Sequence, residues 1–86
     1  MEALQPLFER ISGPYHGYYV AAYAIASDDG ILGYAKVCAG PVADVWSCEA
    51  ISKVGCGISS SPENAVDEVE IRARDAIRFL RQYSDF

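Results

Sequence analysis

The stretch from Tyr15 to Val37, YHGYYVAAYAIASDDGILGYAKV, constrains the fold more than any other part of the chain. Tyr18–Ser27 and Ile31–Ala39 are rich in aromatic and β-branched residues, which favour strands. Asp29-Gly30, which lies between them, is among the strongest short signals for a β-hairpin, because glycine tolerates the positive φ angles that a two-residue turn needs. The sequence therefore predicts an antiparallel hairpin closed by Asp29-Gly30.

The two faces of this hairpin differ in kind, because the side chains of a strand alternate between the faces of a sheet. With Asp29-Gly30 as the turn, Tyr23 lies opposite Lys36. One face then carries large side chains and is rich in tyrosine. This tyrosine face comprises Tyr19, Ala21, Tyr23, Ile25, Leu32, Tyr34, Lys36 and Cys38. The other face is flat and aliphatic, and it comprises Tyr18, Val20, Ala22, Ala24, Ile31, Gly33, Ala35, Val37 and Ala39. A three-residue turn would mix the two sets, so their segregation favours the two-residue turn.

A long amphipathic helix is predicted for residues 62–82. Ser61 is a good N-cap, and Pro62 has the fixed φ angle that suits the first helical position. The apolar residues fall on one stripe of a helix with a period of 3.6 residues, and they are Val66, Val69, Ala73, Ala76, Ile77 and Leu80. Acids crowd the start of this helix and arginines its end, which complements the helix dipole. Two favourable i,i+4 ion pairs are expected, Glu68–Arg72 and Glu70–Arg74.

The remaining segments give weaker signals. Residues 2–11 carry apolar residues at helical spacing around Pro6, which predicts a short helix or a turn that ends at Ser12–Pro14. Val45–Ile51 is a predicted third strand, with Trp46, Cys48 and Ala50 directed towards the helix. Lys53–Ser60 extends that strand or forms a fourth one, and its glycines Gly55 and Gly57 mark a bend or bulge. We therefore expect one α+β domain over residues 1–86. It contains a three- or four-stranded antiparallel sheet, one long C-terminal helix on one face, and a short N-terminal helix or turn.

The charge of the chain excludes some partners. The net charge is −5, whereas a nucleic-acid surface needs Lys and Arg to neutralise phosphates. No apolar run approaches the ~20 residues that span a bilayer. The N-terminal residues MEALQPLFERI lack the basic and apolar segments of a secretory signal. We expect a cytoplasmic protein that binds neither nucleic acid nor membrane.

The cysteines and the histidine do not form a recognisable site. Cys38, Cys48 and Cys56 have the spacing of neither a C-x-x-C redox motif nor paired zinc knuckles. We expect small buried hydrophobic residues in a reducing compartment; the alternative is a tetrahedral zinc site completed by His16. His16 beside Cys38 is the one nucleophile–base pair that the hairpin allows. A surface turn histidine is the simpler interpretation. We predict no catalytic, cofactor-binding or metal-binding residue, and no cofactor.

The tyrosine face needs a second explanation, because one helix covers only one face of a sheet. The N-terminal segment folds over it, a second copy of the chain packs there, or another protein binds it. Tyrosine suits an interface that also meets water. The candidate partner-binding residues are Tyr19, Tyr23, Leu32, Tyr34 and Lys36.

Two resemblances accompany these patterns. Tyr15, Gly17, Tyr18 and Asp29-Gly30, followed by a Glu-Ala-rich helix, resemble the opening of small bacterial proteins of unknown function, which supports the fold and implies no activity. The strand-strand-strand-helix order ending in GCGISSSPENAVDEVEIRARDAIRFL also resembles the HicB-type antitoxin domain. That resemblance rests on Gly55-Cys56, the serine turn and the acidic-alanine helix start, and it implies binding of a small toxin ribonuclease.

The function expected from the sequence is that of a small non-catalytic interaction module. It self-associates or binds a protein partner through the tyrosine face. The alternative is an antitoxin-like regulator whose acidic surface binds a basic partner.

Overall fold

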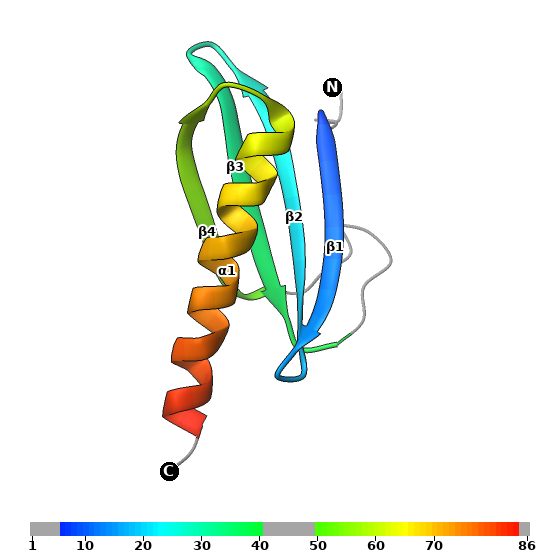
Figure 1. Ribbon diagram of the computed structural model, residues 1–86, viewed down its shortest axis with the longest axis vertical. Helices are drawn as coiled ribbons and strands as arrows, with labels where there is room; N and C mark the ends of the chain where they lie inside the picture. Colours follow the sequence, from blue (N-terminus) through cyan, green and yellow to red (C-terminus); the bar gives the residue numbers. More distant parts are fainter. Residues whose placement is uncertain (1–5, 41–49, 85–86) are drawn as a thin grey trace.

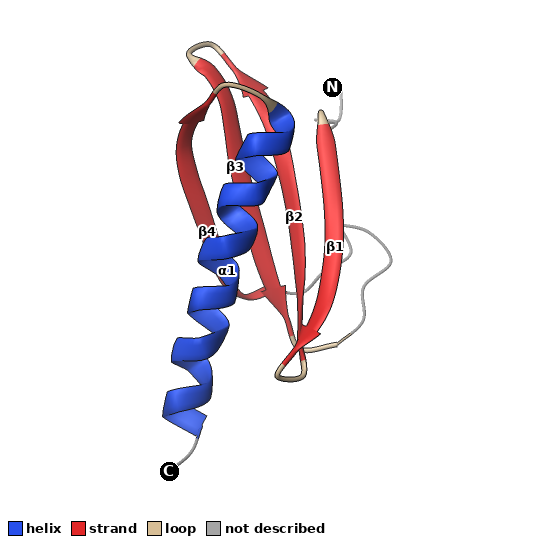
Figure 2. Ribbon diagram, viewed as in Figure 1, coloured by secondary structure: helices blue, strands red, loops and turns tan. Residues whose placement is uncertain are grey.

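The computed structural model describes residues 6–40 and 50–84, apart from the side chains of residues 81–84. Four strands precede one helix, with the order β1 (Phe8–Tyr15), β2 (Tyr18–Ser27), β3 (Gly30–Cys38), β4 (Ala50–Ser59) and α1 (Pro62–Ser84). The strands form one antiparallel sheet in the order β1-β2-β3-β4. The helix α1 crosses one face of this sheet (Figures 1 and 2). The α+β class is confirmed, and the sheet has four strands.

The β2–β3 turn lies one residue earlier than expected. Its two loop residues are Asp28 and Asp29, and Ser27 pairs with Gly30. Gly30 has a φ angle of 142°, which disfavours residues with a side chain. A Cβ atom at Gly30 would also lie 2.6 Å from Cγ2 of Ile58. Glycine is therefore required at the first position of β3, just after the turn and not inside it.

This turn changes the pairing partners within the hairpin but not its faces. Tyr23 lies opposite Tyr34 and not opposite Lys36, as the Asp29-Gly30 turn would require. The observed pairing differs from the expected one by two residues. Side chains alternate with a period of two, so a shift of two returns every residue to its original face. The predicted segregation of aliphatic from tyrosine-rich residues is therefore confirmed.

The N-terminal segment is a strand, which corrects the expected helix. Phe8 to Ser12 pair with residues 20–24 of β2. Backbone pairing with an open sheet edge overrides the weak helical spacing of the apolar residues, because Pro6 limits a helix here and the edge of β2 offers unsatisfied hydrogen-bonding groups. The register is irregular between Ser12 and Tyr15. Residues 2–5 of the expected helix lie outside the described part.

Strand β4 contains the end of the predicted third strand together with its proposed extension. It runs from Ala50, and a register irregularity between Leu32 and Tyr34 of β3 faces the Gly55–Ile58 stretch. The predicted bulge at these glycines is thus confirmed. Ala50 pairs with Cys38, which places it on the tyrosine face. The expectation that it faces α1 is wrong, because a second irregularity separates the Val37 and Cys38 pairings. Trp46, Cys48 and the rest of 45–49 lie outside the described residues.

The helix starts as predicted. The backbone N–H of Asn64 donates to Oγ of Ser61 at 3.1 Å, which is the bond of an N-cap serine. Glu68 and Arg72 form the expected ion pair, with Oε1 and Nη2 3.2 Å apart. Four members of the predicted apolar stripe are fully buried, namely Val66, Val69, Ala73 and Ile77. The helix therefore presents the predicted side to the sheet.

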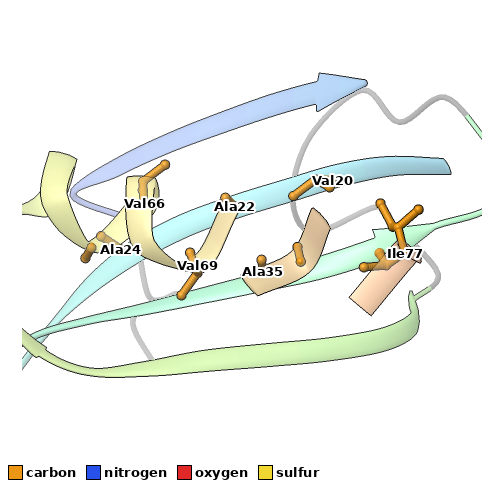
Figure 3. Packing of buried hydrophobic residues seen from close by; sticks show 10 residues of the cluster. Val20, Ala22, Ala24, Ala35, Val66, Val69 and Ile77 are labelled. Carbon is orange, nitrogen blue, oxygen red and sulfur yellow. The ribbon is translucent and has the colours of Figure 1, made fainter. Parts of the chain in front are cut away.

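The core between α1 and the sheet is built from small aliphatic side chains (Figure 3). The sheet contributes its aliphatic face, with Val20, Ala22, Ala24, Ala35 and Val37 all buried. Gly33 lies directly under the first turns of α1, where an added Cβ would come within 2.6 Å of the carbonyl oxygen of Ala65. Small residues at these positions allow the helix to lie close to the backbone of the sheet.

Polar contacts link β1 to α1 at the edge of this core. Arg10 donates to Asp67 at 2.8 Å and lies 3.7 Å from Glu70. The hydrogen bond to Asp67 raises the pKa of Arg10 above its ordinary value. Ser12 donates to the same Glu70 at 3.1 Å, and the Arg74 guanidinium lies 4.8 Å from the centre of the Tyr15 ring. The predicted Glu70–Arg74 ion pair is thus replaced by contacts of both residues with β1.

The two sides of α1 allow a matched test of this packing. Ile77 is fully buried and Ile71 is 60% exposed on the same helix. Ile77→Ala should lower the free energy of unfolding by about 2–5 kcal/mol, because it removes buried methyl groups and leaves a cavity. Ile71→Ala should change it by about 0.5 kcal/mol or less. Urea unfolding followed by circular dichroism measures both, and equal losses would contradict the assignment of the buried side.

Candidate functional site

The sheet face opposite α1 contains all five predicted partner-binding residues. Tyr19 and Tyr23 alternate with the buried Val20, Ala22 and Ala24 along β2. On β3 the same alternation sets apart Leu32, Tyr34 and Lys36. The structure therefore brings Tyr19, Tyr23, Leu32, Tyr34 and Lys36 onto one surface, as the alternation of the sequence predicts.

Tyr23 and Tyr34 form the centre of this surface. Their rings stack with centroids 5.8 Å apart and planes inclined by 30°, because the observed register places them directly opposite each other. Burial raises the pKa of the Tyr23 hydroxyl above its ordinary value of 10.0, and the charge of Tyr34 adds to this effect. On the other side of Tyr34 lies Gly55 of β4, whose missing side chain leaves that ring bordered by backbone.

One half of the tyrosine face is packed on itself. Ala21 and Cys38 are buried there, and Ile11, Tyr19 and Tyr23 pack against them. Ile11 comes from β1, so the N-terminal strand adds its side chains to this face. Ile11 thereby contributes to a second, smaller hydrophobic cluster. Of the three explanations for this face, cover by the N-terminal segment does not hold for Phe8–Tyr15, which form an edge strand. Tyr19 therefore serves packing more than exposure.

The other half, near the β2–β3 turn, exposes apolar side chains. Ile58 is 61% exposed, Leu7 just before β1 is 51% exposed, and Tyr34 is 36% exposed. Ile25 and Leu32 lie between them and are half-buried. We call these five residues, together with Tyr23, the hairpin-end patch. Sequence reasoning missed Leu7 and Ile58, because their places depend on β1 being a strand and on the bulge in β4.

Charges border the hairpin-end patch on two sides. Glu9 of β1 pairs with Tyr23 at one edge of the sheet. Lys53 of β4 pairs with Lys36 at the other edge. Glu9 and Lys53 are both exposed. The tyrosine face therefore combines an apolar centre with a glutamate at one margin and lysines at the other.

The outer edge of β4 already makes a hydrogen bond with the helix. Nη1 of Arg72 donates to the backbone carbonyl of Gly55 at 3.1 Å. An added strand would need such edge carbonyls as acceptors. Because Arg72 occupies this one, strand addition at β4 is disfavoured, and the open face is the better candidate for binding.

The cysteines differ from the sequence expectation. Cys38 is disulfide-bonded, so the expectation of three reduced cysteines is wrong, and the His16–Cys38 nucleophilic pair lacks its thiol. Cys56 is a free thiol, with Sγ 3.9 Å from the carbonyl oxygen of Ala65. Cys48 lies outside the described residues.

His16 serves the geometry of the β1–β2 turn. It has a φ angle of 53° and is followed by Gly17 with a φ angle of 86°. Two successive residues with positive φ are what a tight two-residue hairpin turn needs. Within residues 6–40 and 50–84, no group of three or more His, Cys, Asp or Glu residues is arranged to hold a metal ion.

No protein-family model, curated protein or solved structure was found to match the chain. Within the described residues, α1 is too polar to count as a membrane-crossing helix. The tyrosine face is therefore the feature from which a function can be inferred.

The partly buried Tyr23 predicts a loss of stability in alkaline solution. Its raised pKa means that the folded chain holds this proton more tightly than the unfolded chain. The contribution is complete below the unfolded pKa of about 10, and it is lost as pH rises through the folded pKa. Urea midpoints at pH 8 and about pH 11 should therefore fall more for wild type than for Tyr23→Phe. Identical falls in the two proteins would contradict the raised pKa of Tyr23.

Proposed function

We propose that this protein is a small non-catalytic interaction module that binds protein through the hairpin-end patch. The observation that carries the proposal is the exposure of Leu7, Tyr34 and Ile58 together at one end of a sheet face on which, among residues 6–40 and 50–84, no helix packs. Contiguous exposed apolar surface on a small soluble domain marks interaction sites. A protein partner would remove this surface from water and gain the free energy of its burial.

The composition of the patch supports a protein partner. Tyrosine and aliphatic residues form its centre, and Glu9 and Lys53 lie at its margins. Protein interfaces combine an apolar, aromatic centre with a polar rim in the same way. The stacked pair Tyr23–Tyr34 is held in place by the sheet, so little side-chain freedom is lost on binding.

A nucleic-acid partner has less support. Tyrosine rings can stack on bases, but backbone binding also needs a positively charged surface. On this face Lys36 and Lys53 are accompanied by Glu9, and the chain as a whole carries a charge of −5. The partner of the tyrosine face is therefore a protein in this proposal.

The antitoxin-like alternative would use the acids at the start of α1. Three of these acids already contact arginines of the same chain: Asp67 and Glu70 lie beside Arg10, and Glu68 lies beside Arg72. Their field towards an incoming basic partner is correspondingly reduced. The tyrosine face is therefore the stronger candidate for the binding surface.

A photo-crosslinking amino acid tests the proposal in the native cell. Benzoylphenylalanine replaces Tyr34 in the hairpin-end patch or, as a control, Ile71 on the outer side of α1. Both sites are exposed and lie on opposite sides of the molecule. Irradiation should give a discrete protein adduct from position 34 and not from position 71, because a bound partner covers the patch.

Mass spectrometry then identifies the adduct. Adding Leu32→Ser to the Tyr34 variant should reduce its yield, because Leu32 lies within the patch. The absence of an adduct at position 34, or the same adduct at position 71, would refute the proposed binding surface.

A further inference from the structure

We infer that the partner of the hairpin-end patch is a second copy of this chain, packed face to face about a two-fold axis that runs along the strands. This inference rests on the proposed function, because it names the occupant of the same surface. On the tyrosine face, the side chains of one strand form a column, and residues paired across neighbouring strands form a row. The inference follows because the rotation places apolar rows on apolar rows and the acidic margin on the basic margin.

The tyrosine face can be described by its columns. The strands stand in the order β1-β2-β3-β4. A two-fold axis parallel to the strands keeps the height of each residue and exchanges the outer columns, β1 with β4, and the inner columns, β2 with β3. The strands of the two sheets remain aligned, which is one of the two common arrangements of packed sheets. The interface is isologous and closes as a dimer.

The apolar residues meet apolar residues under this rotation. Ile25 and Leu32 are opposite each other in one sheet, so Ile25 of one copy faces Leu32 of the second copy. Ile58 at the β4 edge faces the beginning of β1, where Leu7 lies. All the members of this row are at least partly exposed in the single chain. The rotation therefore buries the side chains whose exposure the fold leaves unexplained.

The stacked tyrosines lie in the next row. Tyr23 and Tyr34 are also opposite each other, so Tyr23 of one copy faces Tyr34 of the second copy. Four rings then meet at the centre of the interface. Offset aromatic contacts contribute beyond the area they bury, and tyrosine hydroxyls at such a centre can still reach water or one another.

The charges at the margins complete the match. Glu9 stands in the β1 column and Lys53 in the β4 column, two pairing positions apart along the strands, so they occupy adjacent rows of the tyrosine face. The rotation brings Glu9 of one copy above Gly55 and beside Lys53 of the second copy. Gly55 has no side chain, which leaves room for the carboxylate. Each dimer thus gains two Glu9–Lys53 ion pairs, and its two-fold symmetry makes them identical.

Other arrangements of two copies do not give this match. A two-fold axis across the strands reverses the rows and places each outer column on itself, so β1 faces β1 and β4 faces β4, and Glu9 stays at the margin opposite Lys53. Pairing through the β4 edges would displace Arg72 from the Gly55 carbonyl. Only the axis along the strands pairs the two opposite charges.

A charge-exchange series tests the inference. Sedimentation equilibrium of the purified chain from about 1 μM to about 1 mM covers the affinities of small interfaces. Wild type should dimerise in this range. Glu9→Lys and Lys53→Glu should each raise the dissociation constant about tenfold, because both ion pairs become like-charge pairs. The double variant E9K/K53E should return to within about threefold of wild type, because the opposite charges meet again with their places exchanged.

Matched controls separate this effect from net charge. Glu63→Lys and Arg78→Glu make the same changes in charge on α1, at exposed positions away from the tyrosine face, and both should leave the dissociation constant unchanged. Circular dichroism of all variants confirms folding. A wild-type monomer throughout, or a dimer in which the double variant is no better than the single ones, would overturn the inference. The proposed function would survive either result if position 34 crosslinks to a different protein in the cell, and it would fail if no protein adduct forms there.

Discussion

The pairing of β2 with β3 holds two kinds of side chain on opposite sides of one sheet, and the rest of the structure depends on it. Valines and alanines lie on one side and form the surface on which α1 packs. Tyrosines lie on the other side, where the packed elements of the fold leave them partly open. A pairing shifted by one residue would place tyrosines under the helix, where Gly33 and the alanines leave no volume for them. The two-residue turn at Asp28-Asp29 therefore sets both the core and the candidate binding surface.

The fold could be predicted wherever local signals agreed with one another. The alternation of residues 18–38 and the capped, amphipathic pattern of residues 61–80 gave the faces of the hairpin and the buried side of α1. The turn was misplaced by one residue because Asp-Gly usually occupies both loop positions. Here Gly30 is needed by β3 itself, since Ile58 lies against it. The faces survived this error because the resulting shift was two residues.

The remaining errors came from interactions between distant segments. Phe8–Ile11 has no strong preference of its own and becomes a strand because β2 offers an edge and Arg10 meets Asp67 of the helix. Ala50 lies on the other face of the sheet because of a register irregularity, and no short sequence motif predicts this irregularity. For the candidate site, alternation found the five residues of the inner strands. The residues from β1 and β4, such as Ile58 and Glu9, depend on the tertiary register and were not found.

The small residues of β2 and β3 beneath α1 limit how this sequence can change over time. A side chain at Gly33 would meet the backbone of α1, and larger side chains at the fully buried Ala22 and Ala24 would overpack the core, so that side tolerates few substitutions. The opposite side touches none of these contacts. Its exposed residues are free to vary without cost to the core, so lineages of this scaffold could acquire new binding preferences while the architecture stays fixed.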